Sequence, residues 1–247
     1  MFTMLDTLFN INTIMYTFPI AGWGVDTYAM SYLEFWVSLL NLGSVIAFRK
    51  NHISAYPLSI IACGGLAVMF YQINLYSDQL LNIYFIVISI FGWIWWKKKK
   101  DDGSELFSIR YMNKAYQLRM IVTSVISIVL LGTFIDPIFS LLATLVATIL
   151  GESYSHTNAA LPYWDATTTV LSVFAMYLLT RRYVESWILW VIVNVISVGL
   201  YYYRGVLFLS LEYIIFLANA IYAWYLWHKE SLSYSSNLNT FDSVTRS

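Results

Sequence analysis

The chain has 247 residues, of which 59% are hydrophobic and 11% are charged, and its formal net charge at pH 7 is zero. Because ordinary soluble domains carry roughly 25% charged residues, this composition excludes a soluble globular protein. The charged residues are also bunched, which leaves apolar stretches about as long as the roughly 20 residues that a helix needs to cross a bilayer.

These apolar stretches are too long and too continuous for the strands of a membrane barrel, and a backbone in lipid must satisfy its own hydrogen bonds. The sequence therefore predicts an all-α integral membrane protein with seven core transmembrane helices. The predicted spans are residues 31–48, 53–74, 78–96, 119–135, 163–180, 184–203 and 206–227.

The amino-terminal segment, 1–30, is moderately apolar but is interrupted by polar residues and by Pro19. No Lys or Arg precedes Arg49, so we predict no cleavable signal peptide. Two alternatives stay open for this segment, namely a helix that lies in the membrane interface and an extra transmembrane helix. Charge and length favour the interfacial helix.

The third span ends in GWIWW, beginning at Gly92, and four consecutive lysines follow it. Tryptophan prefers the headgroup level and lysine the cytoplasmic side, so this helix is predicted to leave the membrane inward. With seven spans, 13 of the 14 Lys and Arg lie on that side if the interfacial Arg119 is counted, and only Arg204 lies opposite. The loop at 97–118 and the polar tail at 229–247 are therefore predicted to be cytoplasmic, and the tail to be disordered.

Two tryptophan clusters indicate an internal repeat; the alternative is a chance echo, because tryptophan gathers at membrane interfaces in any case. A single constant shift along the sequence aligns the halves of the chain without a gap, placing Trp93 on Trp224 and Trp96 on Trp227. We call this offset the repeat shift. Three crossings end on the opposite side from where they begin, so two parallel triplets need one linking helix between them. Parallel repeats about an axis along the membrane normal are a transporter architecture. The predicted parts are a first triplet at 31–96, a linking helix and surface segment at 119–162, and a second triplet at 163–228.

The sixth span carries a polar and aromatic face. Trp187, Trp190, Asn194 and Ser197 follow one another at spacings of three, four and three, which places them on one side of a helix. Any one of these residues could serve only to hold the bundle together through an interhelical hydrogen bond. Their combination favours a ligand site, because polar groups inside lipid are costly and usually face the bundle interior.

Two other spans add to this interior. The third span offers Asn82 and Trp93, and the seventh offers Glu212, the one carboxylate set well inside a span. Glu212 either faces the cavity as a counter-charge for a cationic ligand or is a protonated or hydrogen-bonded structural group. Aromatic faces suit flat or cationic rings, and asparagine suits amides and hydroxyls, so we expect a small, polar, ring-bearing cargo.

The sequence lacks the common motifs of nucleotide-dependent and zinc-dependent enzymes, GxxxxGK[ST] and HExxH. Paired acidic residues deep in the bundle, which proton or sodium coupling often needs, are also missing from the predicted spans. We therefore expect no enzymatic activity, no cofactor and no metal, and facilitated diffusion as the mode of transport.

The runs NLYSDQLLNIYFIVISIFGWIWW and SLEYIIFLANAIYAW, with the W-x-x-W-x-x-x-N segment that begins at Trp187, resemble the PnuC-type nicotinamide riboside transporters of bacteria. The resemblance implies a 3+1+3 helix fold, a homotrimer and multi-pass insertion in the cytoplasmic (inner) membrane. It also implies uptake of nicotinamide riboside for NAD biosynthesis by facilitated diffusion, with a cytoplasmic riboside kinase trapping the product.

Carried over by motif, the resemblance implies ligand contacts from Trp190, Asn194 and Asn82. The position of Asn82 is commonly glutamine in the family, so its shorter amide reaches about one methylene less far. The predicted substrate-binding residues are Trp190, Asn194, Asn82, Trp187, Ser197, Trp93, Glu212 and Tyr213. The predicted partners are nicotinamide riboside, the lipid bilayer and further copies of the chain, with no nucleic acid. Thiamine or another vitamin is the alternative cargo, because related transporters of the same fold carry such molecules.

Overall fold

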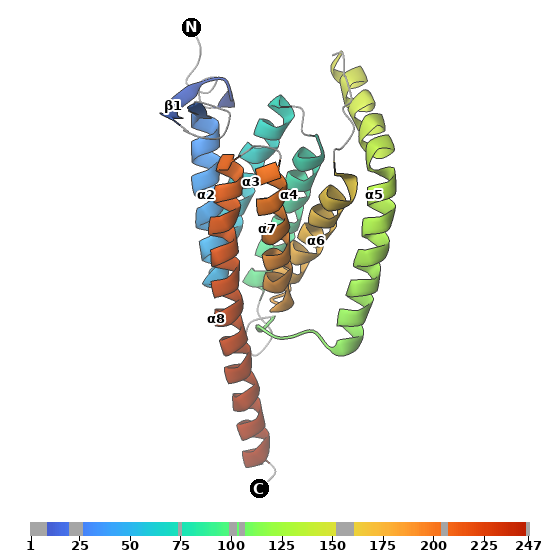
Figure 1. Cartoon of the computed structure of the whole chain (residues 1–247). Coiled ribbons are helices and arrows are strands. Elements are labelled where there is room, and N and C mark those ends of the chain that lie inside the picture. The colour runs from blue at the N-terminus through green and yellow to red at the C-terminus, as the bar shows by residue number, and fades with distance from the viewer. Residues whose placement is uncertain are drawn as a thin grey trace.

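The computed structural model describes residues 9–19, 27–73, 76–98, 103, 107–151, 161–203 and 207–245. Seven helices make up most of this part of the chain, and one pair of strands lies near the amino terminus (Figure 1). The elements are β1 (Ile14–Pro19), β2 (Thr27–Ser31), α2 (Tyr32–Arg49), α3 (Ala55–Gln72), α4 (Tyr76–Lys97), α5 (Lys114–Leu150), α6 (Pro162–Thr180), α7 (Glu185–Tyr203) and α8 (Leu207–Thr245).

Six of the helices form a closed ring. Helices α2, α3 and α4 pack against one another in chain order, as do α6, α7 and α8, while α4 lies against α6 and α2 lies against α8. Helix α5 packs outside the ring, chiefly on α6, and forms one edge of the molecule (Figure 1). The interior of the ring is therefore built by the triplet α2–α4 and the triplet α6–α8.

The six ring helices begin close to the starts of the spans predicted from the sequence. Local signals explain two of the starts: the Ser31 hydroxyl accepts a hydrogen bond from the backbone N–H of Glu34 at 3.1 Å, and Pro162 occupies the first turn of α6. Within the described residues, α3, α4, α5 and α7 are long and apolar enough to cross a membrane. The protein is a multi-pass membrane protein.

The amino-terminal region differs from both alternatives that the sequence left open. Where it is described, it forms neither an interfacial helix nor an eighth span, because β1 and β2 pair as antiparallel strands, with Thr17 opposite Ala29 and Phe18 opposite Tyr28. The run IMYTFP is rich in β-branched and aromatic residues, which favour strands, and Pro19 ends it. Residues 1–8 and 20–26 lie outside the described part of the chain.

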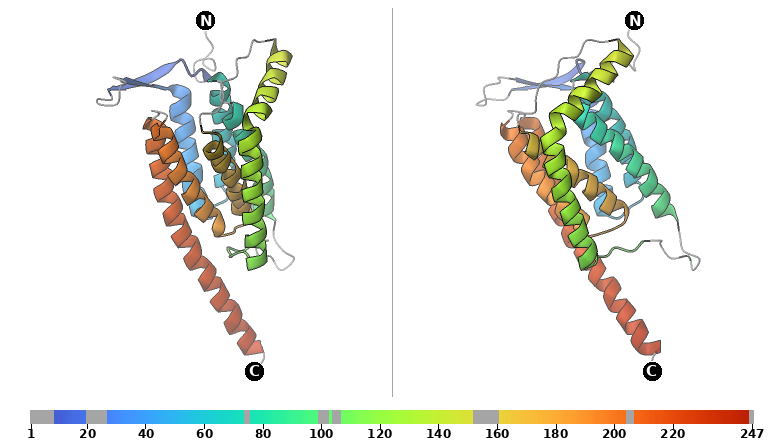
Figure 2. Two further views of the ribbon diagram at one scale, coloured as in Figure 1. Left: turned by 45° about the vertical axis from the view of Figure 1, so that its right-hand side comes forward. Right: turned by 90° about the vertical axis from the view of Figure 1, so that its right-hand side faces the viewer.

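Two helices are longer than the sequence predicted. Helix α5 joins the predicted span at 119–135 and the segment at 137–150 into one helix of 37 residues. It is about 55 Å long at 1.5 Å per residue, and it changes direction in its upper part, where Pro137 removes a backbone hydrogen bond (Figure 2). Helix α8 continues to Thr245 through the tail predicted to be disordered. Neither Gly nor Pro occurs between residues 207 and 245, so nothing in that sequence stops helix propagation.

The largest buried cluster lies at one end of the ring, which we call the basic end because Arg49, Lys97, Arg181 and Arg182 end or follow helices there. Large aromatic side chains dominate this cluster, and Trp227 and Tyr56 are fully buried. Their packing fixes how the two triplets meet at this end. The opposite end of the ring carries the strand pair (Figure 1).

Candidate functional site

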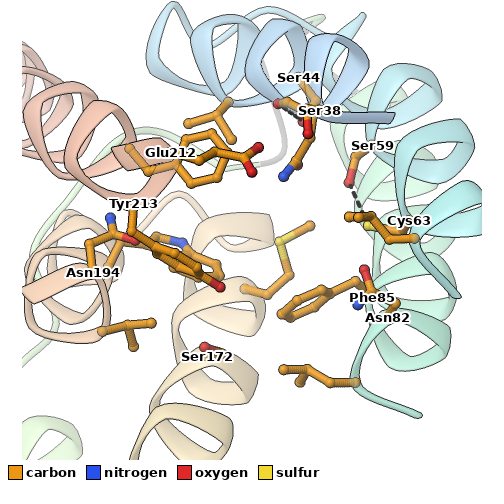
Figure 3. Close-up of a pocket in the computed structure, with 18 of the residues that line it drawn as sticks. Ser38, Ser44, Ser59, Cys63, Asn82, Phe85, Ser172, Asn194, Glu212 and Tyr213 are labelled. Carbon is orange, nitrogen blue, oxygen red and sulfur yellow. Dashed lines mark hydrogen bonds between the residues drawn. The ribbon is translucent and has the colours of Figure 1, made fainter. Parts of the chain in front are cut away.

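A cavity of about 170 Å³ lies inside the ring. Every one of the six ring helices contributes lining residues, and α5 contributes none among the residues described. Figure 3 shows polar side chains reaching into it from several helices, with Asn82 and Asn194 on different sides. The cavity is therefore a shared interior of the two triplets.

The two triplets line this cavity with matching positions. Nine pairs of lining residues are related by the repeat shift, the same offset that aligns the tryptophan clusters. The pairs are Asn41 and Ser172, Val45 and Met176, Phe48 and Leu179, Ser59 and Trp190, Cys63 and Asn194, Phe70 and Tyr201, Leu81 and Glu212, Asn82 and Tyr213, and Phe85 and Phe216. Most pairs differ in chemistry, so matching positions of the two triplets present different side chains to the cavity.

Helix α7 brings Trp187, Trp190 and Asn194 to the cavity on one face, as their spacing predicts. Asn194 is 4% exposed, and its side-chain amide has no hydrogen-bond partner within the described residues. The indole N–H of Trp187 is buried and likewise lacks an acceptor there. The Trp190 ring is half-buried and lies 6.1 Å from the ring of Phe85, centroid to centroid. This face offers a ring for stacking beside an amide with free hydrogen-bonding capacity.

Asn82 and Tyr213 also line the cavity, from the first and second triplets respectively. The Asn82 amide nitrogen donates to the carbonyl of Asp78 at 2.8 Å, one turn back on the same helix, so mainly its oxygen is left for a ligand. Tyr213 stacks on Tyr201 at 5.2 Å with an angle of 16° between the rings. Both rings of the stack belong to the cavity lining, and Figure 3 shows the ring of Tyr213 there.

Glu212 lies in the cavity lining, together with Glu34 and Asp78, whereas no Lys, Arg or His is among the described lining residues. Its carboxylate points across the cavity toward Ser38 of α2, which is its hydrogen-bond partner (Figure 3). All three acids lie in the first two turns of their helices, at the end of the ring opposite the basic end. The cavity is thus acidic toward the end that carries the strand pair.

The strand pair contributes to this acidic end. The hydroxyl of Tyr28, on β2, donates a hydrogen bond to Glu34. Burial, and then this bond and the negative charge of the carboxylate, raise the pKa of Tyr28 above its usual value, so the hydroxyl remains a proton donor. The amino-terminal segment is also held to the ring, because Gln72 of α3 bonds to the backbone of Phe9 and Ile11.

Two of the predicted site residues do not line the cavity. Trp93 lies at the basic end, where the ammonium of Lys97 sits 4.4 Å from the centre of its ring. Ser197 is buried behind the lining and is a hydrogen-bond partner of Tyr213. Trp93 therefore helps to anchor a helix end, and Ser197 positions a lining residue.

The sequence analysis missed the polar lining of α2 and α3. Glu34, Ser38 and Asn41 follow a spacing of four and three, so they share one face of α2, and this spacing is the sequence signal for the polar lining of that helix. On α3, the repeat shift applied to Trp190 and Asn194 points to Ser59 and Cys63. In the described chain no group of three or more His, Cys, Asp or Glu is arranged to hold a metal ion.

The sequence of this chain is similar to those of known transporters. The family model described as nicotinamide mononucleotide transporter matches residues 31–229. The nicotinamide riboside transporter PnuC of Escherichia coli strain K12 is 33% identical over 225 residues, covering 89% of this chain and 93% of that protein. The protein of the same name from Neisseria mucosa is 26% identical over 206 residues, covering 81% of this chain and 73% of that protein.

A solved structure has the same fold. The crystal structure of the vitamin B3 transporter PnuC superposes with a TM-score of 0.60, and it covers 82% of this chain and 83% of its own. The two sequences are only 23% identical, so this structural similarity is evidence for the fold alone. The region matched by the family model contains five of the ring helices whole, α8 as far as Lys229, and every residue that lines the cavity.

Proposed function

This chain belongs to the family of nicotinamide mononucleotide transporters, and on that basis we propose that it takes up nicotinamide riboside by facilitated diffusion. The observation that carries the proposal is a cavity lined by aromatic rings, amides and carboxylates, without a basic residue among its described lining. Nicotinamide riboside is a flat pyridinium cation joined to a ribose. Aromatic rings and carboxylates attract the cation, and amides can bond its carboxamide and hydroxyl groups.

Charge distinguishes the riboside from the mononucleotide that gives the family its description. The mononucleotide carries an additional phosphate, and phosphate sites are normally built from Arg, Lys or helix amino termini. Glu34, Asp78 and Glu212 would instead repel the phosphate, because like charges in a partly desolvated cavity interact strongly. The lining therefore favours the riboside as cargo.

The ligand contacts that we propose begin with Trp190 and Asn194. The indole would stack on the pyridinium ring, and the unpaired amide would bond the carboxamide or the ribose. Asn82, Trp187, Tyr213 and Glu212 would complete the site from the other lining helices. The acidic end of the cavity would draw the cation in.

We also propose the helix arrangement, membrane orientation and oligomeric state that the sequence predicts. The matched lining positions support two parallel three-helix repeats joined by α5, a 3+1+3 arrangement. The basic end would face the cytoplasm, with the carboxyl terminus, because Lys and Arg gather on the inner side of membrane proteins. We further propose a homotrimer in the bacterial inner membrane and a cytoplasmic riboside kinase that traps the cargo for NAD biosynthesis.

Thiamine is the second candidate cargo. It also carries a permanent positive charge on an aromatic ring, so the same acidic and aromatic lining accommodates it. The names of the relatives favour the riboside, since both are nicotinamide riboside transporters.

Calorimetric titration of the purified protein with nicotinamide riboside, nicotinamide mononucleotide and thiamine tests the proposal. We expect the riboside to bind most tightly. Glu212→Gln should reduce the difference in affinity between the riboside and the mononucleotide, because it removes a negative charge while keeping the shape of the side chain. Tighter binding of thiamine would select the second candidate. Preferential binding of the mononucleotide would contradict the charge argument altogether.

A further inference from the structure

Two tryptophans tie the triplets together at the basic end through bonds of the same kind. The indole N–H of Trp96, on α4, donates to the carbonyl of Thr180, the last residue of α6, at 3.0 Å. The indole N–H of Trp227, on α8, donates to the carbonyl of Arg49, the last residue of α2, also at 3.0 Å. Each bond joins one triplet to the other, so the triplets cannot separate at this end without breaking both.

The two bonds are reciprocal. The repeat shift relates Trp96 to Trp227 and also Arg49 to Thr180, so each triplet supplies one donor and one acceptor at matching positions. Both donor rings and Thr180 are buried, at 8%, 0% and 0% exposure. A packing accident would not be expected to repeat donor, acceptor and distance in both halves of the chain.

The backbone beyond each acceptor repeats as well. Asn51 and Arg182, which the repeat shift also relates, have φ values of 52° and 57° and are the only non-glycine residues with positive φ in the described chain. This left-handed conformation is sparsely populated by residues with a side chain. Both residues lie two positions after an acceptor, where they reverse the chain between α2 and α3 and between α6 and α7. The acceptor carbonyls are thus presented by matching turns.

The pair of bonds lies directly beside the cavity. Phe48 and Leu179, which immediately precede the two acceptors, both line it. Trp187 lines it too, and its ring meets the ring of Trp227 edge to face at 5.6 Å. In the other half, Tyr56 meets Trp96 in the same manner at 5.0 Å. Buried aromatic rings therefore fill the space between the cavity and the basic end.

We propose that Trp96 and Trp227 are the gate residues of the basic end, and that their reciprocal bonds hold the cavity closed toward that side. Release of cargo there requires both indole bonds to break as the triplets move apart, and their re-formation closes the cavity again. As a step in a transport cycle, this inference rests on the proposed function. The closure itself is a property of the protein without cargo and can be measured without it.

Cys63 makes the gate observable. It is the only cysteine of the chain, it lines the cavity and it is 5% exposed. A charged, membrane-impermeant maleimide is added to right-side-out or inside-out vesicles, and the rate of Cys63 labelling is measured from each face. The variants are Trp96→Phe, Trp227→Phe and the double variant, which keep a ring and remove the N–H donor.

We expect each single variant to label about two- to tenfold faster from the face that carries the basic end, as the loss of one net hydrogen bond implies, and the double variant faster still. Labelling from the opposite face should not change. Trp36→Phe is the matched control, because Trp36 is 48% exposed on the outer surface of α2. Thermal unfolding of each variant checks that it is folded.

A further variant weakens the gate and leaves both indoles unchanged. Asn219→Leu removes the acceptor of the Arg49 guanidinium, whose bond to the Asn219 amide oxygen measures 3.0 Å, and should also speed labelling from the basic face. Equal rates in the parent and the double variant, or acceleration from both faces alike, would overturn the gate. Nicotinamide riboside should slow labelling of the parent. If it does not while the variants still open, the cargo proposal fails and the gate stands.

Discussion

Trp190 and Asn194 lie four residues apart on α7, and both face the cavity, so substitutions there report on ligand contact. Stacking on a desolvated cationic ring contributes about 0.5–2 kcal/mol, and an unpaired polar group beside the ligand costs about 1–3 kcal/mol. We therefore expect Trp190→Ala and Asn194→Leu each to weaken binding of nicotinamide riboside from several-fold to about a hundredfold, since about 1.4 kcal/mol is a factor of ten. Calorimetric titration measures the change.

Ile192→Leu serves as the control for this pair. Ile192 lies on the same helix but is 41% exposed on the outer surface, so its substitution should leave binding unchanged. If Trp190→Ala and Asn194→Leu fold normally and still bind like the parent, the α7 face only packs helices and the site lies elsewhere.

Individual residues were predictable where spacing alone decides their direction. The spacing on α7 predicted that Trp187, Trp190 and Asn194 share a face, and all three line the cavity, because helical geometry fixes which residues lie on one side. Ser197 belongs to the same predicted face but is buried behind the lining, because helical spacing does not fix how far along the helix the cavity reaches. The same spacing could not tell that Trp93 would sit beneath Lys97, since that contact depends on where the helix ends relative to the cavity. Glu34 was missed as a lining residue because it stands near a helix start, where acids are common for local reasons.

Among the elements, α4 depends on a close approach at Gly92. A Cβ atom there would overlap the ring of Tyr56 and lie 2.7 Å from the Thr180 methyl carbon, and both neighbours are fully buried. Gly92→Ala should therefore destabilise the protein by about 1–3 kcal/mol through overpacking, despite the higher helix propensity of alanine. Thermal unfolding of the purified protein should show a lower midpoint.

Gly64→Ala on α3 provides the comparison, because nothing lies within 4 Å of the Cβ atom it would add. This variant should unfold at the same temperature as the parent or higher. A Gly92→Ala protein as stable as Gly64→Ala would show that α4 does not pack as closely on its neighbours as the structure has it.

Ring helices were predictable as elements because an apolar run of about 20 residues has few alternatives in lipid. The strand pair was not, because the segment 1–30 lacks both a span-length apolar run and a helical polar face, and its pairing depends on two short stretches meeting in space. The sequence also did not predict that α5 is one continuous helix. Pro137 reads as a helix end in sequence, yet a membrane helix can carry a proline as a bend.

At the scale of the whole molecule, the structure removes one argument for facilitated diffusion. The sequence showed no paired acids in its spans, whereas the fold brings Glu34 and Glu212 to one cavity. We still expect facilitated diffusion, since a cationic cargo can itself neutralise these carboxylates. In sealed vesicles without kinase, with sodium and pH equal on both sides, nicotinamide riboside should equilibrate across the membrane.

The same vesicles can test the opposite hypothesis, ion-coupled uptake. An imposed proton or sodium gradient should not drive the internal concentration above the external one. Accumulation under a proton gradient that is lost in Glu34→Gln would instead identify the two acids as a coupling site and replace facilitated diffusion with ion-coupled uptake.

Helix α8 leaves the ring and continues as a single rod, and Figure 1 shows its last turns extending beyond every other helix. Its 39 residues measure about 58 Å at 1.5 Å per residue. A membrane protein with little mass outside the detergent or lipid gives little contrast for aligning particle images in electron cryomicroscopy. A soluble helical domain fused in register after Thr245 would inherit the direction of α8 and supply the missing alignment marker outside the micelle.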